Sequence, residues 1–307
     1  MKPIVVVGSI NMDLVCRTGR IPQPGETITG LGFQMHSGGK GANQAVAVAR
    51  LGWPSILLGM CGDDIFGRQL LSILTGYGVD TQHVGTVAGS SGTASIVVDA
   101  QGENTIIVTP GANLMVTEAY LKTKLDVLRG AGMVLAQLEI PLSTVQWLAD
   151  CCAELNVPFM LDPAPAADLP ASLLSKVTWF TPNQTEAEFY VPWTRFGEEI
   201  VPALLTAGIR NVILKLGSDG VLLATADGVL EKIPAYDMQA VDTTAAGDAF
   251  NGAFAMAVMR GQSPVESARF AVAAAGISVT REGAQPSLAS QGEVDAVLFQ
   301  DSLHPEP

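Results

Sequence analysis

The chain has 307 residues, of which 48% are hydrophobic and 15% charged, and its 17 basic and 30 acidic side chains give a net charge of −13. This composition supplies enough apolar material for a large buried core and excludes a disordered chain. The acidic balance argues against nucleic acid and anionic membrane as partners, since both require a basic protein face.

The N-terminal residues Met1-Lys2-Pro3 lead directly into apolar, strand-like sequence, without the apolar segment that directs secretion. No apolar run approaches the ~20 residues that are needed to span a bilayer. The cysteines show neither metal-ligand spacing nor a disulfide pattern; they are Cys16, Cys61, Cys151 and Cys152. We therefore expect a soluble protein of the reducing cytoplasm.

Short apolar strand candidates alternate with segments of helical periodicity along most of the chain. The strand candidates lie at residues 4–8, 55–60, 133–137, 158–161, 179–181, 211–216 and 221–225. The helix candidates lie at residues 41–51, 66–77, 117–128, 143–154, 198–207, 246–260 and 264–279. Near-continuous hydrophobic strands that alternate with helices are typical of a mostly parallel sheet with helices on both faces. The sequence therefore predicts a single α/β domain over residues 1–307.

Two segments, 13–36 and 86–109, break this alternation. Both contain strand-like pieces separated by turn signals such as Pro24-Gly25 and Gln101-Gly102. They predict a small β-sheet inserted into the domain, and ordinary edge hairpins are the alternative interpretation. Because a small isolated sheet is only marginally stable, we expect it to cover the site or to pair with another subunit.

A glycine-rich turn, Gly38-Gly39-Lys40-Gly41, leads into the helix candidate at 41–51, and Gly52 marks the end of that helix. Lys40 and Asn43 belong to the first turn, on the side that would face a ligand held by the glycine amides. The run therefore indicates a binding site for a polar ligand.

A second run, Thr244-Ala245-Ala246-Gly247-Asp248, opens the helix candidate at 246–260. The small residues from 245 to 247 allow the backbone to approach a ligand closely, and the helix start directs free N–H groups toward it. Such a terminus favours a phosphate or a developing oxyanion. Asp248, held in the first turn, would be positioned to accept a proton beside that anion. An ordinary strand–turn–helix junction is the alternative.

Together, the two runs resemble the N-terminal and C-terminal signatures of the ribokinase branch of the PfkB-type carbohydrate kinases. Further matches are Asn11-Met12-Asp13, Glu139, Asn183-Gln184-Thr185-Glu186 and residues 281–287. They follow the family's order over nearly the whole chain. Ala245 stands where the broader family often has glycine, and we interpret this departure as harmless. The resemblance implies a ribokinase-like fold whose small sheet is both a lid over the sugar and a homodimer contact.

The resemblance implies an ATP-dependent kinase with Asp248 as general base, and with the amides of Ala245, Ala246 and Gly247 as the anion hole. An uncharged sugar requires several fixed donors and acceptors. The expected sugar-binding residues are Asn11, Asp13, Gly38, Gly39, Lys40, Asn43, Glu139 and Asp248. Taken singly, such residues are common in turns and caps.

Asn183 and Glu186 are three residues apart, so at a helix start they face the same way. The resemblance implies that they help to organise Mg²⁺, often through water. A helix cap is the alternative role, and both roles are compatible. The resemblance also implies the nucleotide-binding residues, which are Asn183, Lys215, Leu216, Gly217, Ser218, Asp219, Gly220, Gly247 and Val272.

The loop at 278–287 is expected to run beside residues 242–244 and to hold a monovalent cation such as K⁺. This expectation rests on the resemblance, because the sequence itself shows only a loop rich in Gly, Pro and Ser. The expected ligands are Asp242, Ser287 and the carbonyl groups of Thr244, Ser278, Arg281 and Gly283.

The sequence thus predicts ATP-dependent phosphorylation of the 5-hydroxyl of D-ribose to ribose 5-phosphate. Deoxyribose, another sugar or a nucleoside is the alternative acceptor. A nucleotide-dependent dehydrogenase would need G-x-G-x-x-G after its first strand, but residues 8–13 contain one glycine. A sensing module without catalysis is the non-enzymatic alternative, and the presence of Asp248, Asn183 and Glu186 argues against it.

Overall fold

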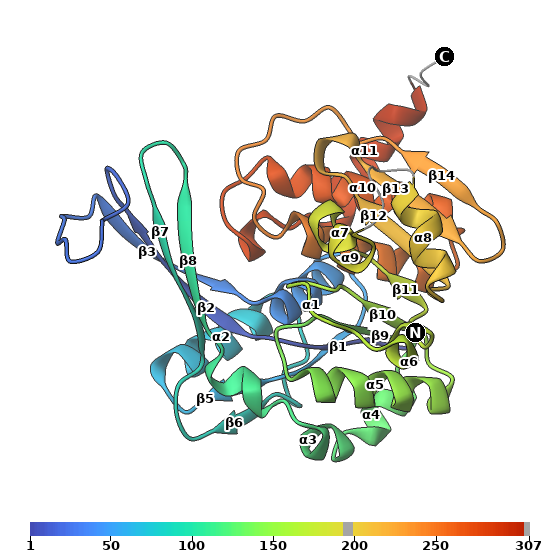
Figure 1. Ribbon diagram of the computed structural model, residues 1–307, viewed down its shortest axis with the longest axis horizontal. Helices are drawn as coiled ribbons and strands as arrows, with labels where there is room; N and C mark the ends of the chain where they lie inside the picture. The colour runs from blue at the N-terminus through green and yellow to red at the C-terminus, as the bar shows by residue number, and fades with distance from the viewer. Residues whose placement is uncertain (193–198, 304–307) are drawn as a thin grey trace.

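The computed structural model describes residues 1–192 and 199–303. Within them, eight strands form a main sheet in the order β14-β13-β12-β11-β10-β9-β1-β4 (Figure 1). The strands are β1 (Ile4–Val7), β4 (Ser55–Leu58), β9 (Met133–Ala136), β10 (Phe159–Leu161), β11 (Trp179–Phe180), β12 (Asn211–Lys215), β13 (Val221–Thr225) and β14 (Leu230–Ile233). The six from β4 to β12 are parallel, whereas β13 runs antiparallel to both of its neighbours. This confirms the predicted mostly parallel sheet.

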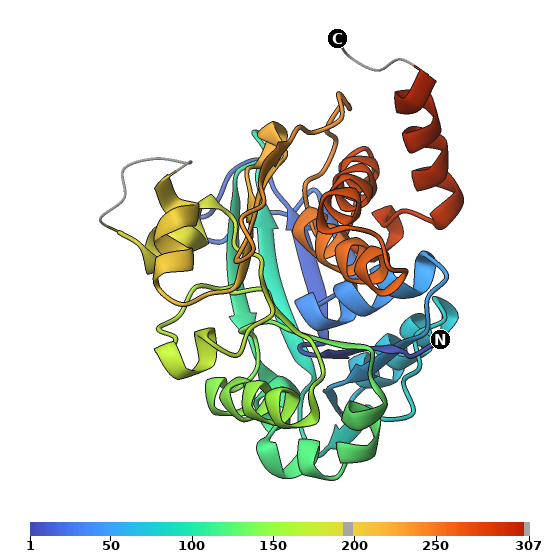
Figure 2. The ribbon, with the colours of Figure 1, turned by 90° about the vertical axis from the view of Figure 1, so that its right-hand side faces the viewer.

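Helices cover both faces of this sheet (Figure 2). One face carries α1 (Lys40–Arg50), α2 (Ile65–Gly76), α9 (Ala246–Met259), α10 (Pro264–Val279) and α11 (Gln291–Leu303). The other carries α3 (Glu118–Lys122), α4 (Leu125–Gly130), α5 (Leu142–Leu155), α6 (Ala171–Leu174), α7 (Gln184–Tyr190) and α8 (Ile200–Thr206). Strands buried on both sides explain why the strand sequences are continuously apolar rather than alternating.

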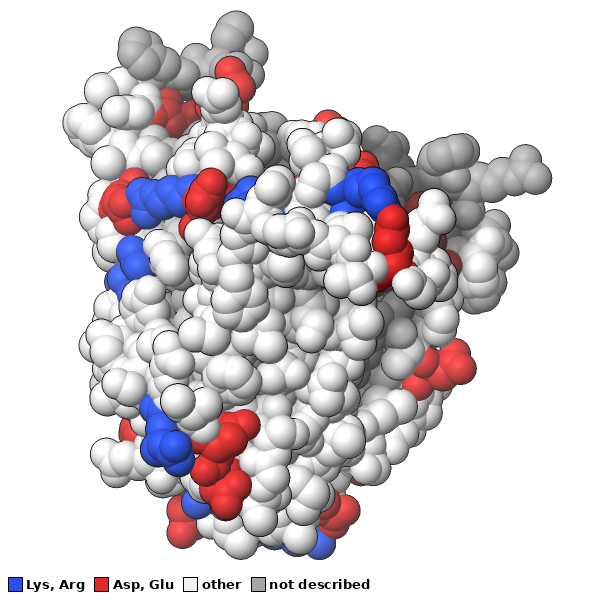
Figure 3. Space-filling view, turned by 90° about the vertical axis from the view of Figure 1, so that its left-hand side faces the viewer, with Lys and Arg blue, Asp and Glu red and all other residues white. Residues whose placement is uncertain are grey.

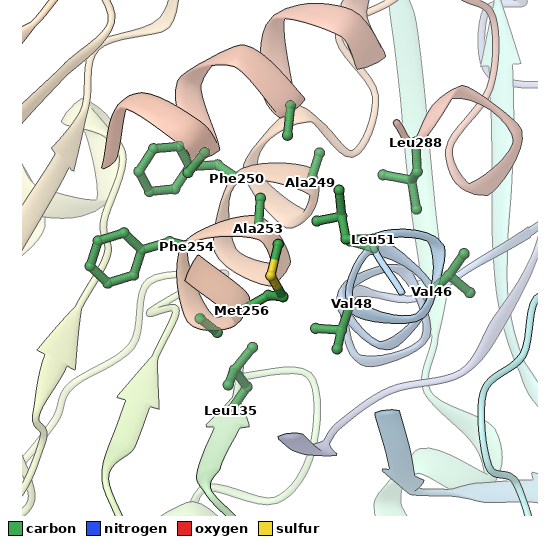
Figure 4. Packing of buried hydrophobic residues seen from close by; sticks show 14 of the residues in the cluster. Val46, Val48, Leu51, Leu135, Ala249, Phe250, Ala253, Phe254, Met256 and Leu288 are labelled. Carbon is green, nitrogen blue, oxygen red and sulfur yellow. The ribbon is translucent and has the colours of Figure 1, made fainter. Parts of the chain in front are cut away.

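Helix α9 is anchored in the first of these layers. The Phe254 ring packs edge-on against Trp179 of β11, with ring centroids 4.8 Å apart, and stacks with Phe250 one turn earlier. In Figure 4, the two phenylalanines project from one side of α9, while Val48 of α1 and Leu51 at the C-terminal end of α1 lie on its other side. The N-terminus of α9 is thereby fixed at the carboxyl edge of the sheet.

A second sheet of order β3-β2-β7-β8 projects from the body of the molecule (Figure 1). Its strands are β2 (Asn11–Arg17), β3 (Gly32–Gly38), β7 (Gly92–Val98) and β8 (Asn104–Thr109). They come from the two segments that broke the α/β alternation, so the predicted small sheet is confirmed. We call these four strands the lid. A short pair, β5 (Met60–Gly62) and β6 (Gly85–Val87), and the turn η1 (Gly111–Met115) lie at its base.

Several boundaries differ from the prediction. The predicted helix at 117–128 is two helices, because the Thr123 hydroxyl donates to the Tyr120 carbonyl (2.7 Å) and ends α3. The strand predicted at 55–60 ends at Leu58, and the chain then joins the β5–β6 pair. Strand β14 and helices α6 and α11 were not predicted, and α7 was anticipated only through the alternative of a helix cap at Asn183. The start of the predicted helix at 198–207 lies outside the described residues, and α8 forms its remainder.

Candidate active site

A cavity of about 740 Å³ lies at the carboxyl edge of the main sheet, beside the N-terminus of α9. The residues that line it come from the ends of β10, β11 and β12, from the β12–β13 turn, from the segment between β14 and α9, from α9 and α10, and from the first residue of α1. Ligands of open parallel sheets bind at this edge, because the loops that follow the strands converge there. The cavity is therefore placed where a substrate of an α/β enzyme is expected.

Helix α9 begins with small residues that face this cavity. Ala245 is its N-cap in a left-handed conformation (φ 62°), which costs a residue with a Cβ about 1–2 kcal/mol. Residues 245–248 all line the cavity. The Ala246 amide already donates to the Thr243 carbonyl at 3.2 Å. In this structure, therefore, that predicted anion-hole donor is engaged within its own turn.

Asp248 lies in the first turn of α9 and is only 6% exposed. Its two carboxylate oxygens accept hydrogen bonds from Asn43 Nδ2 and Gln44 Nε2 of α1, each at 3.0 Å. Burial raises the pKa of Asp248 to about 6, and the nearby Asp162 adds to this, while Lys40 and the two amide donors oppose it. The carboxylate is thus held in one orientation, and its raised pKa is close to the value that suits a general base near neutral pH.

Close contact between α1 and α9 makes this arrangement possible. Gly252 lies one turn after Asp248, and a Cβ there would come within 2.6 Å of the Ala47 side chain. A glycine at this position allows the two helices to approach closely, so that short amide side chains of α1 reach the Asp248 carboxylate.

The predicted sugar-binding residues gather where the lid meets the body. Asn11 opens β2, Asp13 lies two residues along it, and Gly38 ends the paired strand β3. The Asn11 side chain accepts a hydrogen bond from Asn113 Nδ2 at 2.7 Å. Glu139 accepts from the Lys40 amide at 3.3 Å and from the Ser9 hydroxyl.

The pKa values of two ionisable side chains in this group, Asp13 and Lys40, are shifted by their surroundings. Burial, with the Glu139 charge adding to it, raises the pKa of Asp13 to about 7. Burial alone would lower the pKa of Lys40, but four surrounding carboxylates raise it above its ordinary value, so the ammonium stays charged; they are Asp248, Asp162, Glu139 and Glu186. Lys40 and Asp248 line the cavity, whereas Asn11, Asp13, Gly38, Gly39, Asn43 and Glu139 are not among its lining residues and form an adjoining group.

Most of the predicted nucleotide residues line the same cavity as Asp248. Those that line the cavity are Asn183, Lys215, Gly217, Ser218, Gly220, Gly247 and Val272. Leu216 and Asp219 belong to the same turn but are not among the lining residues. Lys215 ends β12 and its Nζ lies 3.0 Å from Asp162 Oδ1. A Cβ on Gly247 would come within 3.3 Å of that same nitrogen, so a cation stands directly at the start of α9.

Asn183 and Glu186 form a capping box at the start of α7. The Asn183 side chain accepts from the Glu186 amide, and the Glu186 carboxylate accepts from the Asn183 amide, each at 2.8 Å. The capping alternative is therefore confirmed. Both residues also line the cavity. Burial raises the pKa of Glu186, with Asp162 adding to the effect and Lys215 opposing it.

The predicted cation loop is brought against the segment that precedes α9. Asp242 accepts from the Thr244 amide (2.9 Å) and hydroxyl (2.6 Å) with one oxygen, and from the Gly283 amide (2.8 Å) with the other. Arg281 is paired with Glu293 of α11. Ser278 and Ser287 are buried, and each hydroxyl donates to a nearby carbonyl. The loop and the α9 start are thus one connected unit.

Sequence reasoning missed several buried polar residues of the site. Gln44 and Asp162 connect Asp248 to Lys215, and Gln285 bonds both Asn43 (3.3 Å) and Ser37 (2.7 Å). Gln44 was adjacent to the recognised Asn43. Asp162 directly follows the buried strand β10, at the edge of the sheet where ligands of parallel sheets bind. A polar residue directly after an apolar strand is the signal that could have identified it.

Among residues 1–192 and 199–303, no cluster of three or more His, Cys, Asp or Glu side chains is placed to hold a metal ion. No helix in the same part of the chain has the length and apolar character needed to cross a membrane.

Comparison with known proteins identifies the family. Residues 1–291 match the family described as pfkB family carbohydrate kinase. A ribokinase of Bacillus subtilis (strain 168) is 41% identical over 97% of this chain and 100% of its own length. A deoxyribokinase of Salmonella typhi is 35% identical over 94% of this chain and 95% of its own. The solved structure of Arabidopsis thaliana ribokinase complexed with ribose and ATP is 35% identical, covers 97% of this chain and 98% of its own, and superposes with a TM-score of 0.89. On this sequence match and this shared fold, the chain belongs to the pfkB family of carbohydrate kinases.

Proposed function

We propose that this kinase transfers the γ-phosphoryl group of ATP to the 5-hydroxyl of D-ribose, giving ribose 5-phosphate. The similarity to a ribokinase and to a ribokinase structure with ribose and ATP supports the two substrates. The observation that carries the proposal is the buried, doubly hydrogen-bonded Asp248 between the sugar-side group and the cavity. A carboxylate there can accept the hydroxyl proton while the start of α9 stabilises charge on the phosphoryl group.

Within this proposal the substrates meet at Asp248. The ribose hydroxyls bind to Asn11, Asp13, Asn43 and Glu139, with the backbone at Gly38 and Gly39 alongside. The nucleotide occupies the cavity, its phosphates near Lys40, Lys215 and residues 245–247. Because Ala246 N–H is engaged with Thr243, an anion would have to replace that bond or use the neighbouring amides.

An assay of ADP release with a panel of acceptors tests the proposal. D-ribose, 2-deoxy-D-ribose, other sugars and nucleosides are compared at equal concentrations with ATP, Mg²⁺ and K⁺. We expect the highest kcat/KM with D-ribose. A higher kcat/KM with deoxyribose, the substrate in the name of one relative, would show that D-ribose is not the preferred acceptor, while phosphoryl transfer from ATP to a sugar would still hold. Nucleotide binding without ADP release from any acceptor would instead identify a sensing module.

Mg²⁺ is proposed to accompany ATP. Glu186 offers one carboxylate to the cavity and its amide partner Asn183 lies beside it. With no three-ligand cluster among the described residues, this fits an ion held by phosphate oxygens and water, as Mg²⁺ commonly is. When bound, the ion would neutralise charge on the phosphates.

A monovalent cation such as K⁺ is proposed to bind at the loop formed by residues 278–287. Its effect would be indirect, because Asp242 joins this loop to the residues that begin α9. We expect turnover to fall several-fold when K⁺ is replaced by a tetraalkylammonium ion at equal ionic strength, with the rate measured at saturating ATP and sugar. Equal rates in the two buffers would exclude this activation.

Sugar affinity is expected to fall as the pH decreases through about 7. The pKa of Asp13 is raised to about 7, so its carboxylate becomes protonated over this range. A protonated carboxyl loses acceptor capacity for sugar hydroxyls. Calorimetric titration with ribose without ATP, between pH 8.5 and pH 6, measures this apart from catalysis. A dissociation constant that does not rise toward pH 6 would contradict the role of Asp13.

The lid is proposed to cover the sugar and to form a homodimer contact. It exposes large apolar side chains on its two outer strands, namely Phe33 and Met35 of β3 and Ile106, Ile107 and Val108 of β8. Figure 3 shows the side of the molecule that carries the lid: its centre is broadly free of charged residues, which gather toward the margins. Apolar surface of this kind marks association sites.

The four cysteines are free, which suits the proposed cytoplasmic location.

A further inference from the structure

A buried link of side chains joins Asp248 to Lys215. Gln44 Nε2 donates to Asp248 Oδ1 and to Asp162 Oδ2, at 3.0 Å each. The other Asp162 oxygen accepts from Lys215 Nζ at 3.0 Å. Gln44 and Asp162 are 1% and 3% exposed, so neither is screened by water. The link therefore runs from the proposed base to the cation beside the start of α9.

The orientation of the Gln44 amide is fixed from both ends. Its oxygen accepts from Gln137 Nε2 at 2.7 Å, while its nitrogen serves the two carboxylates. A flipped amide would place its oxygen against Asp162 and Asp248 and its nitrogen against the Gln137 donor, losing three hydrogen bonds at once. Asp162 thus helps to define which way the Gln44 amide points, together with Gln137 and Asp248 itself, and Gln44 in turn holds one Asp248 oxygen.

We propose that Asp162 is a positioning residue for Asp248, acting through Gln44, whose side-chain amide it holds in the orientation that the base requires. This inference rests on the proposed function, in which Asp248 takes the proton of the sugar hydroxyl. Asp162 would thus assist proton transfer from the sugar hydroxyl, although its ion pair is with Lys215, one of the proposed nucleotide-binding residues.

The two linking residues act on Asp248 with opposite sign. The negative charge of Asp162 favours the protonated form of Asp248 and raises its pKa, whereas the Gln44 hydrogen bond favours the ionised form and lowers it. The other groups that face Asp248 are Lys40 and Asn43, both from α1, and they lower its pKa. Removing Asp162 charge should therefore shift the titration of Asp248 to lower pH, and removing the Gln44 donor should shift it to higher pH.

Asp162→Asn and Gln44→Met are the variants that test this, because both keep the side-chain volume. Carbon-13 NMR of labelled aspartate carboxyl groups follows Asp248 directly, with its signal assigned by its loss in Asp248→Asn. We expect the pKa of Asp248 to change by about 0.5 or more, falling in Asp162→Asn and rising in Gln44→Met. The acid limb of kcat, measured at saturating ribose and ATP, should move in the same two directions. Turnover at the optimum should fall about 10-fold in each variant, since the base is less well oriented.

Ser55→Ala is the matched control, because Ser55 of β4 contacts the same helix. The Ser55 hydroxyl is buried and donates to the Ala45 carbonyl of α1 at 2.8 Å, away from the link. We expect this variant to lose some thermal stability while the Asp248 titration stays in place. If the link had only a structural role, Asp162→Asn and Gln44→Met would behave like Ser55→Ala: they would lose stability and leave the pKa of Asp248 unchanged.

Unmoved titrations, or shifts of the same sign in Asp162→Asn and Gln44→Met, would overturn the inference. If Gln44→Met does not fold, Asp162→Asn is sufficient as a test, because the pKa of Asp248 must fall in that variant. The NMR readout does not depend on turnover. A wild-type protein that releases no ADP with any acceptor would therefore refute the proposed function, while the carboxyl titrations would still decide whether Asp162 acts on Asp248.

Discussion

Asp248→Asn is expected to lower turnover at least about 100-fold while ATP affinity stays within a few-fold of wild type. A positioned general base contributes roughly 10²–10⁴-fold, and asparagine cannot accept the hydroxyl proton. The substitution keeps the shape of the side chain, so the start of α9 and the cavity beside it should remain as they are. Steady-state kinetics with ribose, together with calorimetric titration of ATP, separates the two effects.

Asp126→Asn provides the control for a purely electrostatic role. Asp126 is also an acidic residue in the first turn of a helix, α4, where it pairs with Arg129 at the surface. A first-turn carboxylate is worth only about 0.3–1 kcal/mol through the helix dipole. We expect the control to keep turnover within twofold of wild type. Near-wild-type turnover in Asp248→Asn as well would remove Asp248 as the base.

The motifs that could be recognised from the sequence are those contained in one short segment. Gly38 to Asn43 and Ala245 to Asp248 each combine a turn, a helix start and a polar side chain within a few residues, so local chemistry is sufficient to identify them. The lid was likewise predicted, because its turn signals and strand-like pieces interrupt a regular α/β alternation. These features need no knowledge of which strands become neighbours.

The link through Gln44 and Asp162 depends on long-range packing and could not be predicted in the same way. These residues are 118 positions apart in the chain. Their contact requires both the placement of β10 in the sheet and the close approach of α1 to α9 at Gly252. The orientation of the Ala246 amide is also invisible in the sequence, because it depends on how the preceding turn closes onto Thr243.

Helix α11 is a different case, because its start signal was present and was not used. Ser290 and Glu293 have the serine-then-glutamate spacing of a capping box, and in the structure the Glu293 carboxylate accepts from both the amide and the hydroxyl of Ser290. The same spacing was recognised at Asn183 and Glu186. Glu293 also pairs with Arg281, so this helix supports the loop proposed to hold the cation.

Gly38→Ala is expected to raise KM for ribose about 10- to 100-fold while KM for ATP stays near wild type. A Cβ on Gly38 would lie 2.2 Å from Asp13 Oδ2, so the carboxylate must move away. Hydrogen bonds to a charged group contribute about 1.5–3 kcal/mol, and the displaced carboxylate would lose those proposed to bind the sugar. The protein should still fold, because the clashing atoms are at the end of a side chain and Gly38 lies in an ordinary strand conformation.

Gly32→Ala, at the other end of β3, is the matched control, since a Cβ there meets no atom within 4 Å. Both variants add one methyl group to the same strand of the lid, so a general effect on the lid would appear in both. We expect only Gly38→Ala to affect ribose. A KM for ribose that is unchanged in Gly38→Ala, or raised equally in the two variants, would exclude Asp13 as the residue through which the lid strands hold the sugar.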